Sequence, residues 1–257
     1  MITTEQVKEL RDKTGVSVMQ CKKALEESGG DMEKALLILK KKSTEIAAKK
    51  SDREAAAGAV AKAEAAGHAV LFALRCETDF VAKNADFVAI AETLAQKALA
   101  EGADAAKAAS AELISEGIQK LGENIQFGEL AVVEAPVTGT YVHDGRVGAA
   151  VGLSGGTEAL ARDIAMHIAA MNPEYKTRAD VPAEATDSVK AMFAEEVANS
   201  GKPADIQEKM LAGKIDTFFK ERTLLDQAFI KNPDTTIAAL LKQAGAELVS
   251  FSRVAAA

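Results

Sequence analysis

Apolar residues recur at helical spacing through the first forty residues of the chain. Val18, Cys21 and Leu25 fall on one face of a helix that follows Ser17 and stops at a pair of glycines. Similar start and stop signals flank a helix before it and another after it. About 40 residues is close to the smallest size that supports its own core. We therefore expect a three-helix domain over residues 1–42.

Strand patterns follow a polar, charged segment at 43–54, which we interpret as a linker of helix-permissive residues. The unbroken apolar run at 70–74 is typical of a strand buried on both faces. It forms the second half of a predicted hairpin that turns at Ala66-Gly67. The run ends in the corner Thr78-Asp79-Phe80, after which the apolar spacing predicts one helix over residues 81–101.

The order hairpin, sharp corner, helix occurs a second time. Asp144-Gly145 is a strong two-residue turn signal between two short apolar runs, and Thr157 opens the helix that follows. The two halves share little sequence identity, so the repeat is a hypothesis about pattern. It predicts a two-part α+β core of antiparallel sheets, with one subdomain at 55–137 and another at 138–183.

Two helices joined by a short turn are predicted over residues 184–222. Val189, Phe193 and Val197 recur at intervals of four, which favours an antiparallel helical hairpin with a narrow apolar seam. Residues 223–257 are predicted to form a short helix and a strand that completes a sheet of the core.

Composition and charge narrow the classes of function. The 257 residues are 48% hydrophobic and 27% charged, as in an ordinary globular protein, and the net charge is −7. An acidic chain is a poor sequence-independent binder of nucleic acid, which requires clustered Lys and Arg. No apolar run approaches the roughly 18 residues of a membrane span. Cys21 and Cys76 form no disulfide framework, which favours a reducing, cytoplasmic location.

The residue inventory argues against an enzyme. His68, His143 and His167 lack the i,i+4 partners of a metal site, so we expect no metal and no cofactor. Ser154 stands in a Gly-x-Ser-x-Gly string, but a hydrolase elbow also needs a parallel sheet followed by an acid and then a histidine. Only His167 follows Ser154, which leaves a hydrolase as a minor alternative.

Two sharp corners remain without a chemical role. The apolar tip at 16–19 either folds into the small N-terminal core or forms a recognition loop, since Met adapts well to interfaces. At the other corner, Thr78 or Asp79 can cap the next helix while Phe80 packs inward. The alternative is that Phe80 points outward toward a partner.

An ordered set of motifs resembles the elongation factor Ts family. These motifs are "TGVSVMQCKKALEESGGDMEKALLILKKK", "CETDFVAKNADF", "LGENI", "YVHDGRVG" and "AMHIAAMNPEY". The resemblance implies a ubiquitin-associated-like N-terminal domain, a two-part core and a protruding coiled-coil hairpin. It also implies a cytoplasmic translation factor that promotes GDP-to-GTP exchange on the GTPase elongation factor Tu, with no direct nucleic-acid or membrane contact.

The same resemblance implies roles for individual residues. The loop that enters the GTPase domain and disrupts its Mg²⁺ site matches Thr78, Asp79, Phe80 and Val81. An apolar pair that contacts the nucleotide domain matches Val18 and Met19, and Val18 departs from the Met that is common there. Further contacts with the partner match Lys22, Lys50, Leu121, Gly122 and His143.

Several alternatives stay open at the level of sequence. A non-catalytic scaffold that binds proteins through the N-terminal domain is the main alternative to an exchange factor. A 1:1 complex and a two-plus-two assembly with self-association both fit the motifs. Some family members continue past the last core strand into another helical module, and since this sequence ends at residue 257 we expect that contact to be absent.

Overall fold

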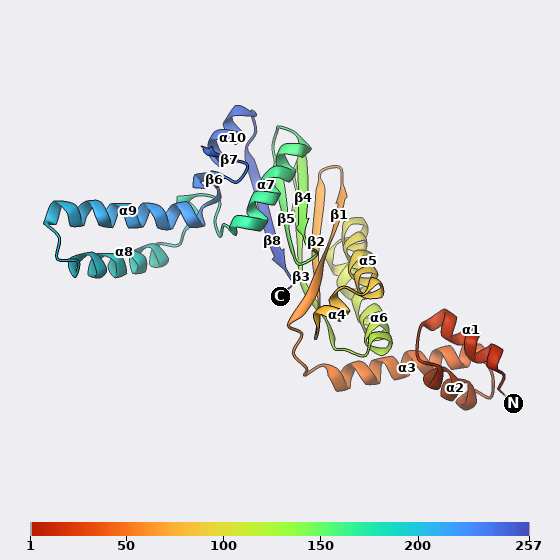
Figure 1. Cartoon of the computed structure of the whole chain (residues 1–257). Coiled ribbons are helices and arrows are strands. Elements are labelled where there is room, and N and C mark those ends of the chain that lie inside the picture. Colours follow the sequence, from red (N-terminus) through yellow and green to blue (C-terminus); the bar gives the residue numbers. More distant parts are fainter. Residues whose placement is uncertain (1, 257) are drawn as a thin grey trace.

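The computed structural model describes residues 2–256 and has a helical unit at each end of a central body (Figure 1). The N-terminal unit consists of α1 (Thr4–Thr14), α2 (Val18–Glu27) and α3 (Met32–Lys50). The unit at the other end is a hairpin of α8 (Ala183–Ala198) and α9 (Ala204–Arg222). Both the three-helix domain and the helical hairpin predicted from apolar spacing are therefore present as elements.

Two three-stranded antiparallel sheets make up the body. The first has the order β1 (Ala57–Ala65), β2 (His68–Cys76) and β3 (Ile125–Glu134). The second has the order β4 (Val137–His143), β5 (Val147–Leu153) and β8 (Leu248–Ala255). The α+β class is confirmed, and the C-terminal strand completes the second sheet as predicted, with Phe251 opposite Val151.

Helices cover the outer face of each sheet. The first sheet carries α4 (Asp79–Ala82), α5 (Ala85–Glu101) and α6 (Ala103–Leu121). The second sheet carries α7 (Glu158–Met171), and α10 (Ile237–Gln243) lies near it with the short pair β6 (Ala228–Phe229) and β7 (Asn232–Thr236). Figure 1 shows the resulting order of layers: α7, second sheet, first sheet, then α5 and α6.

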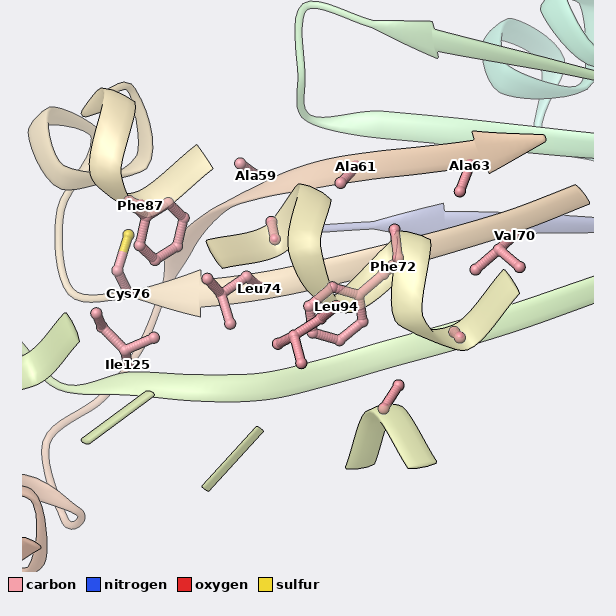
Figure 2. Close-up of a cluster of buried hydrophobic side chains, with 14 of the residues drawn as sticks. Ala59, Ala61, Ala63, Val70, Phe72, Leu74, Cys76, Phe87, Leu94 and Ile125 are labelled. Atoms are coloured by element: carbon pink, nitrogen blue, oxygen red, sulfur yellow. The ribbon is translucent and has the colours of Figure 1, made fainter. Parts of the chain in front are cut away.

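Alternation along β2 explains why this strand is apolar throughout. Phe72 and Leu74 point to the helices, in a cluster with Phe87 of α5 that Figure 2 shows between strands and helix. Leu71, like its neighbours at 69 and 73, belongs to a second cluster that packs against Ala150 of the other sheet. Both faces of β2 are thus buried, as the run at 70–74 predicted.

The two halves of the core repeat one arrangement. In each half, the central strand of the sheet pairs with the strand before it and with a third strand from later in the chain. The central strand then ends in a corner that opens a helix. The turn between β4 and β5 has positive φ at both Asp144 (48°) and Gly145 (67°), as the Asp-Gly signal predicted, but Arg146 also lies between the paired residues His143 and Val147, so the loop has three residues.

Helix boundaries add detail to the sequence-based expectation. Residues 43–50 of the expected helix-permissive linker continue α3, and there Ser43 is buried with its hydroxyl 3.4 Å from that of Ser115 in α6. The single helix expected over 81–101 is divided, since Asn84 caps α5 by accepting a hydrogen bond from Asp86 N–H. Polar residues with local hydrogen-bonding capacity favour such a break.

Buried polar contacts hold the base of the α8–α9 hairpin to the body. His167 of α7 is fully buried, and its Nδ1 accepts a hydrogen bond from Ile230 N–H at 3.2 Å. Its Nε2 therefore carries the proton and donates to Gln227 Oε1 at 2.9 Å. Gln227 in turn donates to the carbonyl of Glu221 in α9. Nearby, Arg178 bridges Asp216 of α9 and Asp226.

Candidate partner-binding surface

The corner after β2 is a one-turn helix with a well-defined start. Thr78 is the N-cap, with φ −127° and ψ 157°, and its hydroxyl accepts a hydrogen bond from Val81 N–H at 3.4 Å. The suggestion that Asp79 caps this helix is therefore wrong: Asp79 is its first residue. The carboxylate of Asp79 stays exposed and lies 3.5 Å from the ammonium of Lys83.

Phe80 points away from the protein. Its side chain is 84% exposed, whereas Val81 beside it is half-buried and packs against the core of the first sheet. A Phe that stapled the corner would be buried, so the inward-packing alternative is wrong. Single exposed apolar side chains are common on protein surfaces, so exposure alone assigns no role to Phe80. At this corner, Thr78, Asp79 and Phe80 are all exposed, and Phe80 is the one large apolar side chain among them.

Leu121, Gly122 and Lys50 lie next to this corner. Leu121 is the last residue of α6, and Gly122 ends the helix in the left-handed conformation with φ 80°. The ammonium of Lys50, at the end of α3, donates a hydrogen bond to the Gly122 carbonyl. The structure thus brings together three sequence-predicted residues from two helix ends.

Glu123 and Glu77 join the helix-end loop to the corner, and sequence reasoning missed both. The carboxylate of Glu123 accepts hydrogen bonds from Thr78 N–H at 3.0 Å and from the Thr78 hydroxyl at 2.6 Å. Glu77 accepts one from Asn124 N–H at 2.6 Å. The pairing of Cys76 with Ile125 sets these segments opposite each other. In the sequence, Glu77 is only an acid before Thr78 and Glu123 only an acid after Gly122, and neither position reveals that the two segments contact each other.

His143 stands at the end of β4, in the turn of the second hairpin. Its exposed ring lies 6.1 Å from the ring of Tyr141, centroid to centroid, and its Nδ1 is 3.1 Å from the Tyr141 hydroxyl. Arg146, three residues later, donates its N–H to the His143 carbonyl. Arg146 also lines a small pocket of about 210 Å³ together with Asp79. The second hairpin therefore borders the corner through Arg146.

Val18, Met19 and Lys22 lie apart from the corner, on α2 of the N-terminal unit (Figure 1). Val18 is 54% and Met19 68% exposed, while Val16 is buried in the three-helix core. The apolar tip at 16–19 thus divides: Val16 packs inward, and Val18 and Met19 form an exposed apolar pair. Lys22 is exposed and its ammonium lies 3.8 Å from Glu26.

Cys76, which is buried beneath the corner, has a thiol of low reactivity. Burial and the nearby negative charge of Glu123 raise the pKa of the Cys76 thiol to about 12. The thiol donates a hydrogen bond to the Thr78 carbonyl at 3.2 Å. Since only the thiolate is a good nucleophile, this cysteine supports the corner rather than reacting. At Glu77, the hydrogen bond from Asn124 N–H holds the pKa of the carboxyl below its usual range.

Two sites considered from the sequence, a metal site and a Ser154–His167 pair, are not assembled in the described residues. Across residues 2–256, no group of three His, Cys, Asp or Glu side chains is placed to hold a metal ion. Ser154 is exposed, whereas His167 is buried and hydrogen-bonded to Gln227 and Ile230. A Ser154–His167 pair is therefore absent. Within the same residues, no helix has the length and apolarity to cross a membrane.

Comparisons with known proteins place the chain in a family. The sequence profile described as Elongation factor TS matches residues 77–257. Elongation factor Ts of Pseudomonas fluorescens is 46% identical over 261 residues, covering 99% of this chain and 90% of that protein. The proteins of the same name from Alcanivorax borkumensis and Saccharophagus degradans are 44% and 43% identical, covering 96% and 98% of this chain and 92% and 90% of their own lengths. The chain therefore belongs to the elongation factor Ts family of translation elongation factors.

Proposed function

We propose that this chain promotes the exchange of GDP for GTP on elongation factor Tu, and that the corner 78–81 enters the GTPase and disrupts its Mg²⁺ and nucleotide site. The observation that carries the proposal is the exposure of Phe80 at a corner held by hydrogen bonds. Exchange makes and breaks no covalent bond, so the proposed role is not that of an enzyme. The factor acts by binding, in the cytoplasm where translation takes place.

The energetics of an exposed Phe suit this role. Transferring a Phe side chain from water into an apolar site is worth roughly 1.5–3 kcal/mol. Lowering the barrier to GDP release by about 1.4 kcal/mol speeds release tenfold. Phe80 alone is therefore able to supply roughly a tenfold to hundredfold effect, provided that its new contacts form as the nucleotide site opens. Larger effects need the remaining contacts.

The remaining proposed contacts extend over two separate surfaces. Val18 and Met19 form the first, an exposed apolar pair at the start of α2, and Lys22 lies one turn away on the same helix. The second surrounds the corner and includes Lys50, Leu121, Gly122 and His143. Contact at both surfaces would fix the orientation of the partner while Phe80 inserts. The net charge of −7 suits a protein partner better than tRNA.

Thermodynamic linkage sets the conditions for exchange. If the factor weakens GDP binding by a given ratio, GDP must weaken factor binding by the same ratio. The chain should therefore bind nucleotide-free elongation factor Tu more tightly than the GDP-bound form. GTP binding then displaces the factor in turn.

The test is release of a fluorescent GDP analogue from purified elongation factor Tu, with excess unlabelled nucleotide. The expected result is a release rate that rises with factor concentration and saturates. Unchanged release at micromolar factor would overturn the proposal. Binding to the GTPase without acceleration would instead indicate a passive scaffold. Light scattering of the complex distinguishes a 1:1 assembly from a two-plus-two assembly.

A further inference from the structure

Two acidic side chains form a reciprocal clamp between the corner and the loop that follows α6. Glu123 accepts hydrogen bonds from both the N–H and the hydroxyl of Thr78, at 3.0 and 2.6 Å. In the opposite direction, Glu77 accepts from Asn124 N–H at 2.6 Å, and Arg53 contacts the same carboxylate oxygen at 3.3 Å. Each segment thus supplies the carboxylate that satisfies a backbone N–H of the other.

The second corner of the repeat shows that the fold does not require this clamp. Thr157 caps α7 as Thr78 caps α4, and its hydroxyl accepts from Leu160 N–H at 3.2 Å. In the part of the chain that the structure describes, no carboxylate accepts a hydrogen bond from Thr157. Starting a helix at such a corner therefore needs only the threonine cap, and the clamp at Thr78 is an additional feature.

A need for stiffness explains why the first corner has the clamp. The helix α4 has only four residues, and it is separated from α5 by a break at Asn84. A single turn of helix is not stable by itself. Phe80 sits on this turn with its side chain in solvent. If the turn were loose, ordering it on binding would consume part of the free energy gained from inserting the ring.

We propose that Glu123 is a positioning residue for nucleotide release: its carboxylate holds Thr78 by two hydrogen bonds, and this fixes the direction in which Phe80 is presented. This inference rests on the proposed exchange function and assigns a role to a residue outside the contact set. The side chain of Glu123 is half-buried and both of its oxygens face Thr78. It acts through Phe80 and does not itself need to touch the partner.

The first test compares Glu123→Ala with Glu129→Ala, which removes an exposed acid from β3 of the same sheet. In the free chain, amide hydrogen exchange at residues 78–82 should accelerate in Glu123→Ala and stay unchanged in Glu129→Ala. Equal protection in both variants and the wild type would overturn the inference. This measurement needs no partner, so it remains decisive even if the chain fails to release GDP.

The second test is the maximal rate of GDP release from elongation factor Tu. Misplacing a reacting group by about 1 Å can cost up to about a hundredfold in rate, and we expect Glu123→Ala to lose roughly tenfold. The factor concentration for half-maximal effect should change little, because the other contacts remain. If the wild type releases GDP and Glu123→Ala matches it, the positioning role fails. If the wild type itself is inactive, the proposed function fails.

Two further variants separate positioning from direct contact. Glu123→Gln removes the charge but keeps one oxygen that accepts from Thr78 N–H, while its new amide group can donate to the Thr78 hydroxyl in a bond of reversed direction, so it should retain most of the activity. Loss of activity in Glu123→Gln equal to that in Glu123→Ala would indicate a charge contact with the partner and overturn the proposal. Adding Glu123→Ala to Phe80→Ala should cause no further loss, since both act through one side chain. Additive losses would also contradict it.

Discussion

Thr78 and Thr157 begin helices at the two equivalent corners of the core with matching backbone angles, φ −127° and ψ 157° at one and φ −129° and ψ 157° at the other. An acidic residue follows each threonine, as helix starts favour. The third position differs: Phe80 at the first corner is replaced by Ala159 at the second. The fold therefore accepts a small residue there, so the geometry of the corner does not by itself require the exposed ring of Phe80.

The two caps provide a matched pair of substitutions. Replacing an N-cap threonine by alanine costs about 1 kcal/mol, so Thr78→Ala and Thr157→Ala should both lower the free energy of unfolding, Thr78→Ala by more because its hydroxyl also donates to Glu123. Only Thr78→Ala should also slow GDP release, because it frees the corner that carries Phe80. Urea titration and the release assay measure the two effects. Equal exchange rates in the two variants would argue against a special role for the first corner.

Substitutions in the apolar tip at 16–19 should distinguish a residue that stabilises the N-terminal unit from one that contacts the partner. Val16 is buried, and Val16→Ala should destabilise the three-helix unit by roughly 2 kcal/mol. Met19 is 68% exposed, so Met19→Ala should leave stability within about 0.5 kcal/mol. Met19→Ala should instead weaken binding to nucleotide-free elongation factor Tu by roughly tenfold, as expected for an interface anchor. Hydrogen exchange of α2 and titration calorimetry distinguish the two outcomes, and unchanged affinity in Met19→Ala would remove this residue from the proposed contacts.

His167 should make the protein sensitive to mild acid. Burial is the main cause that lowers the pKa of His167 in the folded chain, and the Gln227 hydrogen bond opposes it more weakly. As the pH falls below about 6.5, the ordinary His pKa, the unfolded chain takes up a proton that the folded chain resists. Stability is therefore lost with falling pH, by at most about 1.4 kcal/mol per pH unit, until the lowered folded pKa is passed.

The measurement is the urea midpoint of the wild type and His167→Gln between pH 7.5 and roughly pH 5.5, above the range where most carboxylates titrate. The variant should be less stable at neutral pH, because it disturbs the buried hydrogen bonds to Gln227 and Ile230. Its stability should change less with pH than that of the wild type. A parallel decline in both proteins would assign the acid sensitivity to other groups.

Gly139 should be intolerant of any side chain. A Cβ placed there would lie 2.5 Å from the backbone nitrogen of Arg162 and 2.8 Å from the carbonyl carbon of Ala161, both in α7. Because these are backbone atoms, no side-chain rotation can relieve the overlap. Gly139→Ala should therefore push α7 away from the sheet and lower the free energy of unfolding by roughly 1–3 kcal/mol. The control is Gly213→Ala in α9, where a Cβ meets no atom within 4 Å and where Ala favours the helix by roughly 0.5–1 kcal/mol. Denaturant titration should show opposite signs for the two changes.

The sequence predicted the features that depend on local periodicity and local turns. The unbroken apolar run at 70–74, the turn at Asp144-Gly145 and the spacing of Val189, Phe193 and Val197 each correspond to an observed element. The break between α4 and α5 also depends on local hydrogen bonding, through the Asn84 cap. A single Asn in the sequence is a weaker signal than the helical apolar spacing around it, so one continuous helix was predicted. Element existence was therefore more predictable than element boundaries.

Features that depend on distant residues were not predictable. The extension of α3 to Lys50 depends on the burial of Ser43 against Ser115, 72 residues away. The clamp depends on Glu123 facing Thr78, 45 residues away. Likewise, Phe80 is exposed because no element of the folded core packs over it, and this packing cannot be deduced from a single sequence. The resemblance to a known family supplied the candidate contacts, and the structure supplied their arrangement.

Phe80→Ala is the most direct test of the central claim that this exposed ring drives GDP release. Because the side chain is 84% exposed, its removal should change the free energy of unfolding by no more than about 0.5 kcal/mol. At saturating factor, GDP release from elongation factor Tu should slow by roughly tenfold or more, measured by stopped-flow fluorescence. Release as fast as with the wild-type chain would contradict the account.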